Sequence, residues 1–567
     1  MKKPSIKAAG LKKPSLPEIK KPSFDGLPGG SRTGRSLLAA VAVLGVVFGI
    51  AELRPPADPS TAGAPGGATT AQVERSTLVC PPPIQGLFAN TDLTLYDPAG
   101  GKAEGGTASL SDVAPPAGAT AKPSGSGSAQ PSGSPSASPS GSASSKPSGS
   151  ASAKPSAGAP AAPAAGPRLT LAKPGVPVTG RGLAGDTAPG TVATAEGAFA
   201  PGFGLSQTTT YLDQARAGLY GLDCAPSGTD FWFAGASTAQ GRDDYVNLVN
   251  ADSAPATVDI RLVGAKGAID VEAANGITMA PGSSQRVRLK SLLTTAVEPD
   301  LAVHVVVRDG RVGAALNVSD EGKGGDWVAA SAAPAAVQVL PGLPAELASA
   351  RLIVAAPADD DADLKIQISG KNGWFTPAGK ESLHVKAGMV AALDLGPFEH
   401  SEAGAIRLSP SDPAHPTPVV AAVRVDRANN GKADAAWISA AGPIGKRAGL
   451  ADNRGGGATT LYLTATGSAA AKVRLTASAG TGGGTPATKE VDVPAGSTVV
   501  VQNLEPAGLN GVYGITAETV SGGPVVAARM LALPQKDVPM FTVQAFRDDH
   551  STVTVPYAQN DPGLVLR

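Results

Sequence analysis

The chain has little cysteine, few aromatic residues and little charge. Of its 567 residues two are Cys, 4% are aromatic and 17% are charged. A core with so few rings has to be built from Val, Leu, Ile and Ala, which suits thin β-sandwiches better than a large enzyme with a deep pocket. Long helical periodicity is also missing after residue 53, so the pattern predicts an all-β fold.

The residue patterns of common catalytic and metal sites are absent as well. The sequence has no C-x₂-C pair, no H-x₃-H or H-E-x₂-H spacing and no G-x-S-x-G. None of the five histidines has a neighbour at metal-ligand spacing: His304, His384, His400, His415 and His550. In its strand pattern His304 is expected to face the surface or to be hydrogen-bonded in the core. We therefore predict no catalytic residue, no metal site, no cofactor and no enzymatic activity.

One acidic cluster has two interpretations, an ion site and a turn. Asp359, Asp360, Asp361 and Asp363 offer the closely spaced carboxylates that Ca²⁺ prefers. However, the cluster aligns with small polar turn residues in related segments of the chain. A solvated turn is therefore the favoured interpretation, and an ion site is the alternative.

The start of the chain predicts where the protein resides. Leu37 to Ala51 form a run without charge, and residues 1–35 hold nine Lys/Arg against Glu18 and Asp25. Basic residues before an apolar run keep the N-terminus in the cytoplasm. Fifteen helical residues rise about 22 Å, short of the roughly 30 Å hydrocarbon core. Two interpretations remain: a single-pass signal-anchor over 36–53 in the plasma membrane, with the bulk of the chain extracytoplasmic, or a secretory signal that is cleaved.

The basic tail also limits the choice of partners. Residues 1–35 carry a net charge of +7, so the other 532 residues must sum to −7. A nucleic-acid binder would carry its positive charge on the folded domains, so no nucleic-acid partner is expected. Lys-Lys-Pro-Ser recurs three times in the tail, which predicts a disordered arm attracted by anionic lipid; the alternative is that the arm only fixes the topology.

The two cysteines agree with export. Cys80 and Cys224 both follow the apolar run and lie outside the repeats described below. In an oxidising compartment two such residues predict one structural disulfide. Between them, residues 114–167 consist almost entirely of Ala, Pro, Ser and Gly, which predicts a disordered insertion. The flanking segments then form one β-rich module, 75–227.

A segment recurs three times in the second half at a spacing of 106 to 109 residues. Each copy opens on paired apolar residues: Val246/Leu248, Leu352/Val354 and Leu461/Leu463. Alternating runs, a small-residue turn and a closing strand follow in the same order, with closing strands at 312–316, 419–423 and 524–528. The ends are aligned as Trp327-Val328, Trp437-Ile438 and Phe541-Thr542. About seven short strands in roughly 100 residues are typical of an immunoglobulin-like sandwich.

A family resemblance rests on three features. These are the exported N-terminal Cys, the second Cys followed by Phe231-Trp232-Phe233-Ala234-Gly235, and the phrase DYVNLVNADSAPATVDIRL. In these features, over roughly residues 75–545, the chain resembles an actinobacterial family of membrane-anchored or secreted proteins of unknown function with tandem immunoglobulin-like β domains. The resemblance implies a scaffold and carries over no activity.

Together these observations predict an all-β protein with an N-terminal transmembrane helix, a disulfide-closed module and three tandem immunoglobulin-like sandwiches. The expected parts are a basic tail (1–35), a membrane helix (36–53), a linker (54–74), the N-terminal module (75–227), and repeats at 228–334, 335–443 and 444–567 with a C-terminal tail. The favoured function is a binding or structural scaffold in the cell envelope, with a wall glycan or another envelope protein as partner. The alternative is an enzyme, or an accessory subunit of one, that acts on wall polymers.

Overall fold

The computed structural model describes residues 69–98, 105–115, 166–185, 187–213, 215–294, 297–398 and 404–555. The predicted tail (1–35), the apolar run (36–53) and most of the low-complexity tract (114–167) lie outside these ranges. Within the described ranges, no helix combines the length and apolar character that a membrane crossing needs. The described strands belong almost entirely to one compact unit, Thr70–Thr554. The architecture below is that of this unit.

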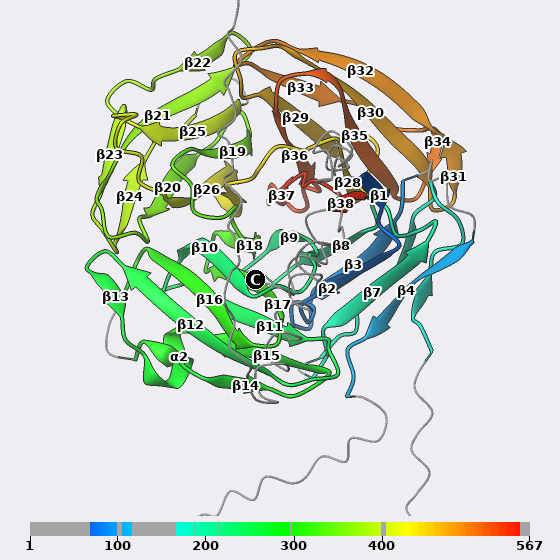
Figure 1. The fold of residues 1–567 in the computed structure, drawn as a ribbon, viewed down its shortest axis with the longest axis horizontal. Coiled ribbons are helices and arrows are strands. Elements are labelled where there is room, and N and C mark those ends of the chain that lie inside the picture. Colours follow the sequence, from blue (N-terminus) through cyan, green and yellow to red (C-terminus); the bar gives the residue numbers. More distant parts are fainter. Residues whose placement is uncertain are drawn as a thin grey trace, which may run out of the picture. The chain divides into compact units, whose positions relative to one another are not determined.

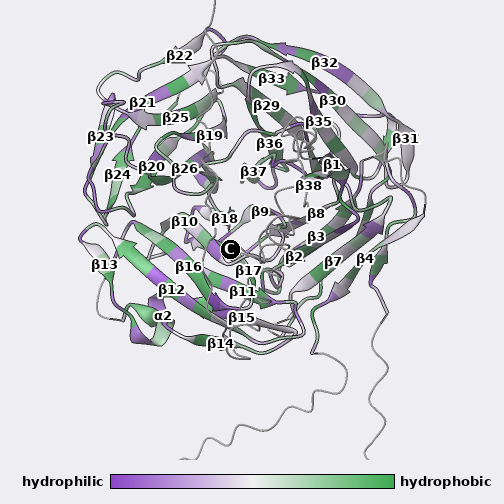
Figure 2. Ribbon diagram, viewed as in Figure 1, coloured by the Kyte–Doolittle hydropathy of each residue, from purple (hydrophilic) through white to green (hydrophobic). Residues whose placement is uncertain are grey.

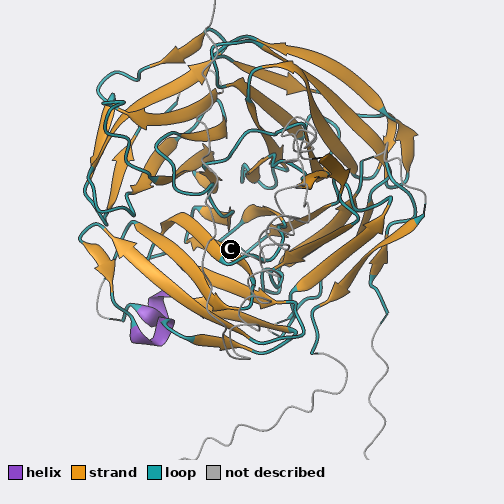
Figure 3. Ribbon diagram, viewed as in Figure 1, coloured by secondary structure: helices purple, strands orange, loops and turns teal. Residues whose placement is uncertain are grey.

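The prediction of an all-β fold is confirmed (Figure 3). In the described residues the helical elements are one short α-helix, α2 (Leu289–Leu292), and one 3₁₀ turn, η1 (Glu272–Ala274). Alternation of period two decides which residues enter the core, as in β12 (Ala256–Gly264), where Val258, Ile260 and Leu262 are buried. Figure 2 shows hydrophobic and hydrophilic residues interspersed along the strands.

Each of the three predicted copies forms two antiparallel sheets around its own core (Figure 1). In copy 1, one sheet has the order β10 (Asp230–Ala236), β16 (Leu301–Asp309), β12 and β13 (Gly267–Ile269), with β14 (Ile277–Met279) also on β12. The other has the order β15 (Ser283–Arg288), β11 (Tyr245–Asn250), β17 (Gly313–Asp320) and β18 (Gly324–Val328).

Copies 2 and 3 repeat this arrangement. In copy 2, one sheet has the order β19 (Gln338–Leu343), β25 (Gly404–Pro410), β21 (Ala362–Gly370) and β22 (Gly373–Phe375), with β23 (Ser382–Val385) also on β21. The other has the order β24 (Val390–Asp394), β20 (Ser349–Ala355), β26 (Val420–Asn429) and β27 (Lys432–Ser439). In copy 3, one sheet has the order β28 (Arg447–Asn453), β35 (Tyr513–Gly522), β30 (Ala471–Gly480), β31 (Gly483–Thr485) and β34 (Ala507–Asn510), with β32 (Ala487–Val493) also on β30. The other has the order β33 (Thr498–Gln502), β29 (Thr459–Ala465), β36 (Val525–Ala532) and β37 (Phe541–Ala545).

The N-terminal module has the same strand order and is a fourth sandwich. Its sheets are β2 (Arg75–Cys80), β7 (Thr191–Gly197), β4 (Gly106–Asp112) and β5 (Leu169–Thr170), and β6 (Val178–Arg181), β3 (Ala89–Tyr96), β8 (Gly204–Tyr211) and β9 (Gly218–Asp223). Leu78, Leu93, Leu110 and Leu205 are buried between them. A further two-stranded sheet joins β1 (Thr69–Gln72) and β38 (Thr552–Val555).

The immunoglobulin-like part of the prediction is not confirmed. In an immunoglobulin constant domain the first two strands pair within one sheet. In copy 1 the first strand, β10, pairs with β16, and the second strand, β11, lies in the opposite sheet between β15 and β17. The same separation holds in copies 2 and 3, so the copies are two-sheet sandwiches with another strand order.

The predicted alignment of copy 3 with the other copies is wrong by one residue in its closing strand. Leu352 and Val354 face Val423 and Ala421, whereas their counterparts Leu461 and Leu463 face Arg529 and Ala527. The matching strand therefore runs over 525–529 rather than 524–528. By the same register Val543, and not Phe541, stands where Trp327 and Trp437 stand. Successive residues of a strand face opposite sides of the sheet. Because of this one-residue difference, Arg529 and not Ala528 stands at the core position opposite Leu461.

The Phe-Trp-Phe-Ala-Gly segment at the start of copy 1 contributes side chains to two hydrophobic clusters. Phe233 packs in the core of copy 1, while Trp232 and Ala234 pack against residues of β20 and β26 in copy 2. At Gly235 the strand bulges with a φ of +98°, and a Cβ there would lie 2.9 Å from the Trp437 ring. Gly342 repeats the device in copy 2, where a Cβ would meet Val543 at 3.0 Å.

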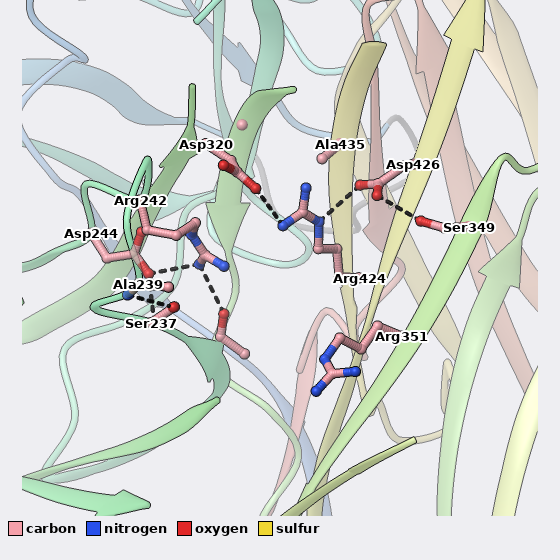
Figure 4. A network of polar contacts seen from close by, with 12 residues as sticks. Ser237, Ala239, Arg242, Asp244, Asp320, Ser349, Arg351, Arg424, Asp426 and Ala435 are labelled. Carbon is pink, nitrogen blue, oxygen red and sulfur yellow. Dashed lines mark hydrogen bonds and ion pairs between the residues drawn. The ribbon is translucent and has the colours of Figure 1, made fainter. Parts of the chain in front are cut away.

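A polar network continues the contact between copies 1 and 2 (Figure 4). Arg424 of β26 contacts Asp320 of β17 at 2.7 Å and Asp426 at 2.8 Å. Arg242, also beside Trp437, pairs with Asp244 at 2.7 Å. Both guanidinium groups lie 5.2 Å from the centroid of the Trp437 ring. The buried indole therefore makes two cation–π contacts, with guanidinium groups that are themselves paired with carboxylates.

Two buried carboxylates join the last strands of all four sandwiches. Asp326 of β18 accepts hydrogen bonds from Gly221 N of β9 and Thr542 Oγ1 of β37, both at 2.8 Å. Asp434 of β27 accepts from Phe541 N at 2.8 Å. It also accepts three further backbone N–H groups, those of Leu219 (3.1 Å), Ala435 (2.9 Å) and Gly325 (3.4 Å). In Figure 1, β9, β18 and β37 lie at the middle of the unit. The two carboxylates therefore join the sandwiches near its centre.

We expect Asp434→Ala to lower the free energy of unfolding by at least about 3 kcal/mol, because it leaves buried N–H groups of four strands unpaired. The measurement is urea unfolding of the full chain. Asp492→Ala, on the exposed face of β32, is the matched control and should change the value by less than about 0.5 kcal/mol. Equal effects of the two substitutions would contradict the assigned role of Asp434.

Candidate functional site

Three adjoining cavities share the side chains of Asp223 and Arg547. Their volumes are about 270, 30 and 880 Å³. Asp223 ends β9 of the N-terminal module, and Arg547 follows β37 of copy 3 by two residues. The three cavities therefore meet at the side chains of Asp223 and Arg547. We name the 270 Å³ space the inner cavity and the 880 Å³ space the outer cleft.

The inner cavity lies between the N-terminal module and copy 1. Its walls come from β2, β9, β11 and β17, with Val79 and Val249 as apolar examples. Gly313 brings the backbone of β17 close to β2, since a Cβ there would lie 2.8 Å from Val79 Cγ1. The small residues Ala314 and Ala315 follow on the same strand and leave the space open.

Among the described residues, the side chains of Asp223 and Arg547 each form one hydrogen bond. Arg547 Nη2 donates to Ala330 O at 2.7 Å, and Ser206 Oγ donates to Asp223 Oδ1 at a long 3.4 Å. Burial raises the pKa of Asp223 to about 7, although the nearby Arg547 and Arg529 act in the opposite direction. Burial also lowers the pKa of Arg547, against the effect of Asp223. Desolvation therefore outweighs the attraction between the two groups.

The outer cleft is bounded by the N-terminal module, copy 1 and residues that follow β37. Three of its charged side chains, Arg311, Asp252 and Asp549, are held in ion pairs. Arg311 binds Asp252 through two hydrogen bonds of 2.7 and 3.1 Å, and Asp549 forms an ion pair with Arg447, whose Nη2 also reaches Pro201 O at 2.7 Å. These pairs fix the shape of the cleft and leave a polar surface with both signs of charge.

The predicted disulfide between Cys80 and Cys224 is present, with a Cα–Cα distance of 5.1 Å. It joins the end of β2 to the residue after β9, and Val79 pairs with Ala225 beside it. Both cysteines are buried, and Cys224 lines the outer cleft. The disulfide thus holds Asp223 in place at the junction of the cavities.

The histidines singled out in the sequence do not converge. His304 is hydrogen-bonded to Asp230 at 2.8 Å and stacks on Trp232 with ring centroids 3.8 Å apart. His384, His415 and His550 each lie beside an aspartate in a different part of the fold. His400 lies outside the described residues. Burial lowers the pKa of His304 despite its carboxylate partner.

The acidic cluster forms a turn. Asp361 accepts a hydrogen bond from Ala387 N at 2.8 Å, and Asp363 pairs with His384 at 2.8 Å. In the part of the chain that the structure describes, no group of three or more His, Cys, Asp or Glu side chains is arranged to hold a metal ion. These contacts support the interpretation as a solvated turn.

Comparison with known proteins gives one match. A family model described as a family of unknown function, DUF5719, matches residues 179–503, which is more than half of the chain. No curated protein matches, and neither does any solved structure.

We expect the double variant Cys80→Ala/Cys224→Ala to lose about 2–5 kcal/mol of stability, because the disulfide closes a long loop in the unfolded chain. Chemical unfolding of both proteins measures the loss. Thiol labelling of the native wild type without reductant should modify neither cysteine. Labelling of both, or an unchanged unfolding midpoint, would contradict this role.

A pH dependence is expected from Asp97, the residue that follows β3 in the N-terminal module. Its carboxylate is buried with no hydrogen-bond partner for either oxygen among the described residues. Burial raises its pKa to about 8, and Arg447 and Asp549 exert opposing smaller effects. The folded state therefore keeps a proton that the unfolded state loses near pH 4. The resulting stability is complete below pH 4 and is lost as the pH rises to about 8.

Relative to Asp97→Asn, the wild type should thus lose about 1.4 kcal/mol of stability per pH unit between pH 5 and 7. Urea unfolding of both proteins across this range measures the difference. The variant is needed because Asp223 and Asp434 also have raised pKa values and contribute in the same direction. Parallel curves for the two proteins would contradict the prediction.

Proposed function

The chain belongs to DUF5719, a family of unknown function, and we propose that it is a non-enzymatic, membrane-anchored binding scaffold of the cell envelope. In this proposal residues 36–53 anchor the protein in the plasma membrane, with the N-terminus cytoplasmic. The four sandwiches lie outside, where the outer cleft binds a wall glycan or another envelope protein. Secretion after cleavage of the apolar run is the alternative for its location.

Two observations support an extracytoplasmic location. The apolar run Leu37 to Ala51 follows nine basic residues. The Cys80–Cys224 disulfide is of a kind that persists in oxidising compartments and is rare in the cytosol. The two features are independent of each other, since one is a property of residues 1–53 and the other belongs to the folded unit.

The observation that carries the binding function is the outer cleft. Its volume of about 880 Å³ is within the range of ligand sites, and it is formed by parts of three sandwiches. Arg311, Asp252 and Asp549 of its lining are already paired, the first two with each other and Asp549 with Arg447. Paired charges supply hydrogen bonds to a polar ligand, whereas a nucleophile or a general base has to be free to react.

One observation favours the second candidate, an enzyme or accessory subunit acting on wall polymers. The pKa of Asp223, raised to about 7 by burial, suits a general acid or base at neutral pH. Because Asp223 lines the outer cleft, a polymer bound there would lie beside it.

Binding and turnover assays of the full chain on peptidoglycan and arabinogalactan-type glycans separate the two. We expect saturable binding without product, and about tenfold weaker binding by Arg311→Ala, which loses a charged hydrogen-bonding group in the cleft. Arg474→Ala, a similarly exposed ion-paired arginine of β30, is the control and should bind normally. Product formation that Asp223→Asn abolishes would support the enzyme instead, and the absence of binding to both polymers would turn the search to envelope proteins.

A further inference from the structure

The inner cavity contains a buried acceptor that nothing in the fold satisfies. Asn247 of β11 is 1% exposed and lines the cavity. Its amide Nδ2 donates to Tyr245 O at 3.1 Å, which fixes the orientation of the side chain. Its Oδ1 has no hydrogen-bond partner among the described residues. Buried polar atoms in native proteins are nearly always paired, so an orphaned oxygen on a cavity wall indicates an occupant that donates a hydrogen bond.

Opposite charges, those of Asp223 and Arg547, stand on the wall of the same cavity, whose other carboxylate, Asp230, is paired with His304 at 2.8 Å. The hydrogen-bond partners of Asp223 and Arg547 are Ser206 and Ala330 rather than each other. Burial shifts the pKa of each group toward its neutral form, so neither charge is fully compensated. A bound group of opposite charge would compensate each of them.

The dimensions restrict the size of the occupant. A volume of about 270 Å³ corresponds to roughly nine waters at about 30 Å³ each, or to a small organic molecule. Val79, Val249 and Phe231 add apolar surface to the lining. A mixed wall of this kind, with a few convergent polar groups, is typical of small-molecule sites.

We propose that the inner cavity binds a small zwitterion of amino-acid or dipeptide size. Its ammonium group pairs with Asp223, its carboxylate pairs with Arg547, and a donor group reaches Oδ1 of Asn247. A zwitterion meets both charges without leaving net charge in a buried space, which a simple amine or a simple carboxylate would do. The site shares Asp223 and Arg547 with the outer cleft, but Asn247 lines the inner cavity and not the cleft, and the proposal does not depend on polymer binding there.

Calorimetric titration of the full chain with glycine, alanine and alanyl-alanine tests the proposal. We expect saturable binding of at least one of them, and at least tenfold weaker binding of its N-acetylated form and of its C-terminal amide. Because these comparisons use the wild-type protein, they hold even where a substitution in the cavity impairs folding.

Variants then assign each end of the ligand. Asp223→Asn should weaken binding of the free ligand at least tenfold and remove most of the penalty for N-acetylation, while Arg547→Gln should do the same for the amide. Asp252→Asn, a carboxylate of the outer cleft that does not line the inner cavity, is the matched control and should bind normally. A crystal structure with the ligand bound would show it beside Asn247.

Three results would overturn the proposal: no saturable heat at millimolar ligand, equal affinity for free and blocked ligands, or density for water alone in a crystal grown with the ligand. A negative result here leaves polymer binding untouched, because that assay reports on the outer cleft and uses different ligands. Conversely, loss of polymer binding with retained zwitterion binding would separate the two sites.

Discussion

The arrangement of this protein depends on two carboxylates that have no access to water. Asp326 and Asp434 accept hydrogen bonds from strands of sandwiches far apart in the sequence, so the last strand of each sandwich is tied to the others. A buried carboxylate is costly unless N–H or O–H groups surround it, and here those groups come from β9 and β37. The contact therefore requires all four sandwiches to be in place. Gly218 and Gly324 have no side chain at the point where Asp434 approaches them, which lets the carboxylate reach the strands.

Around this centre, neighbouring sandwiches interlock through their first strands. The bulges at Gly235 and Gly342 admit Trp437 and Val543 from the following copy, so each first strand is shared between two cores. Close packing of the shared strand therefore fixes the relative position of two sandwiches, which a flexible linker would not do. The cavities that meet at Asp223 and Arg547 are consequently built into the frame, with walls supplied by separate sandwiches.

Much of the fold could be predicted from alternation in the sequence, since pairs such as Leu352 and Val354 are inward-facing where the pattern placed them. The pattern failed where polar residues occupy core positions. Arg529 stands where Leu316 and Val423 stand in the other copies, so the closing strand of copy 3 was aligned one residue early. In the N-terminal module the same position is Gln207, and the low-complexity tract disrupts the spacing, so its kinship with the copies was missed. The disulfide followed from the number of cysteines and their position after the apolar run. The cavities could not be predicted, because Asp223 and Arg547 meet only through the arrangement of whole sandwiches.

Contacts between the first and last sandwiches have a consequence for how the chain is made. Tyr96 meets Thr516 across 420 positions, and Arg454 meets Asp92 across 362. A polypeptide emerging N-terminus first cannot form these contacts until nearly all of it has been synthesised. Until then the surface around Tyr96 has no partner, and the early sandwiches have to persist as a partial assembly. Truncation near the C-terminus would therefore destabilise the N-terminal sandwich as much as the C-terminal one. Chaperones and proteases that act during biogenesis would then recognise the exposed surface of the N-terminal sandwich.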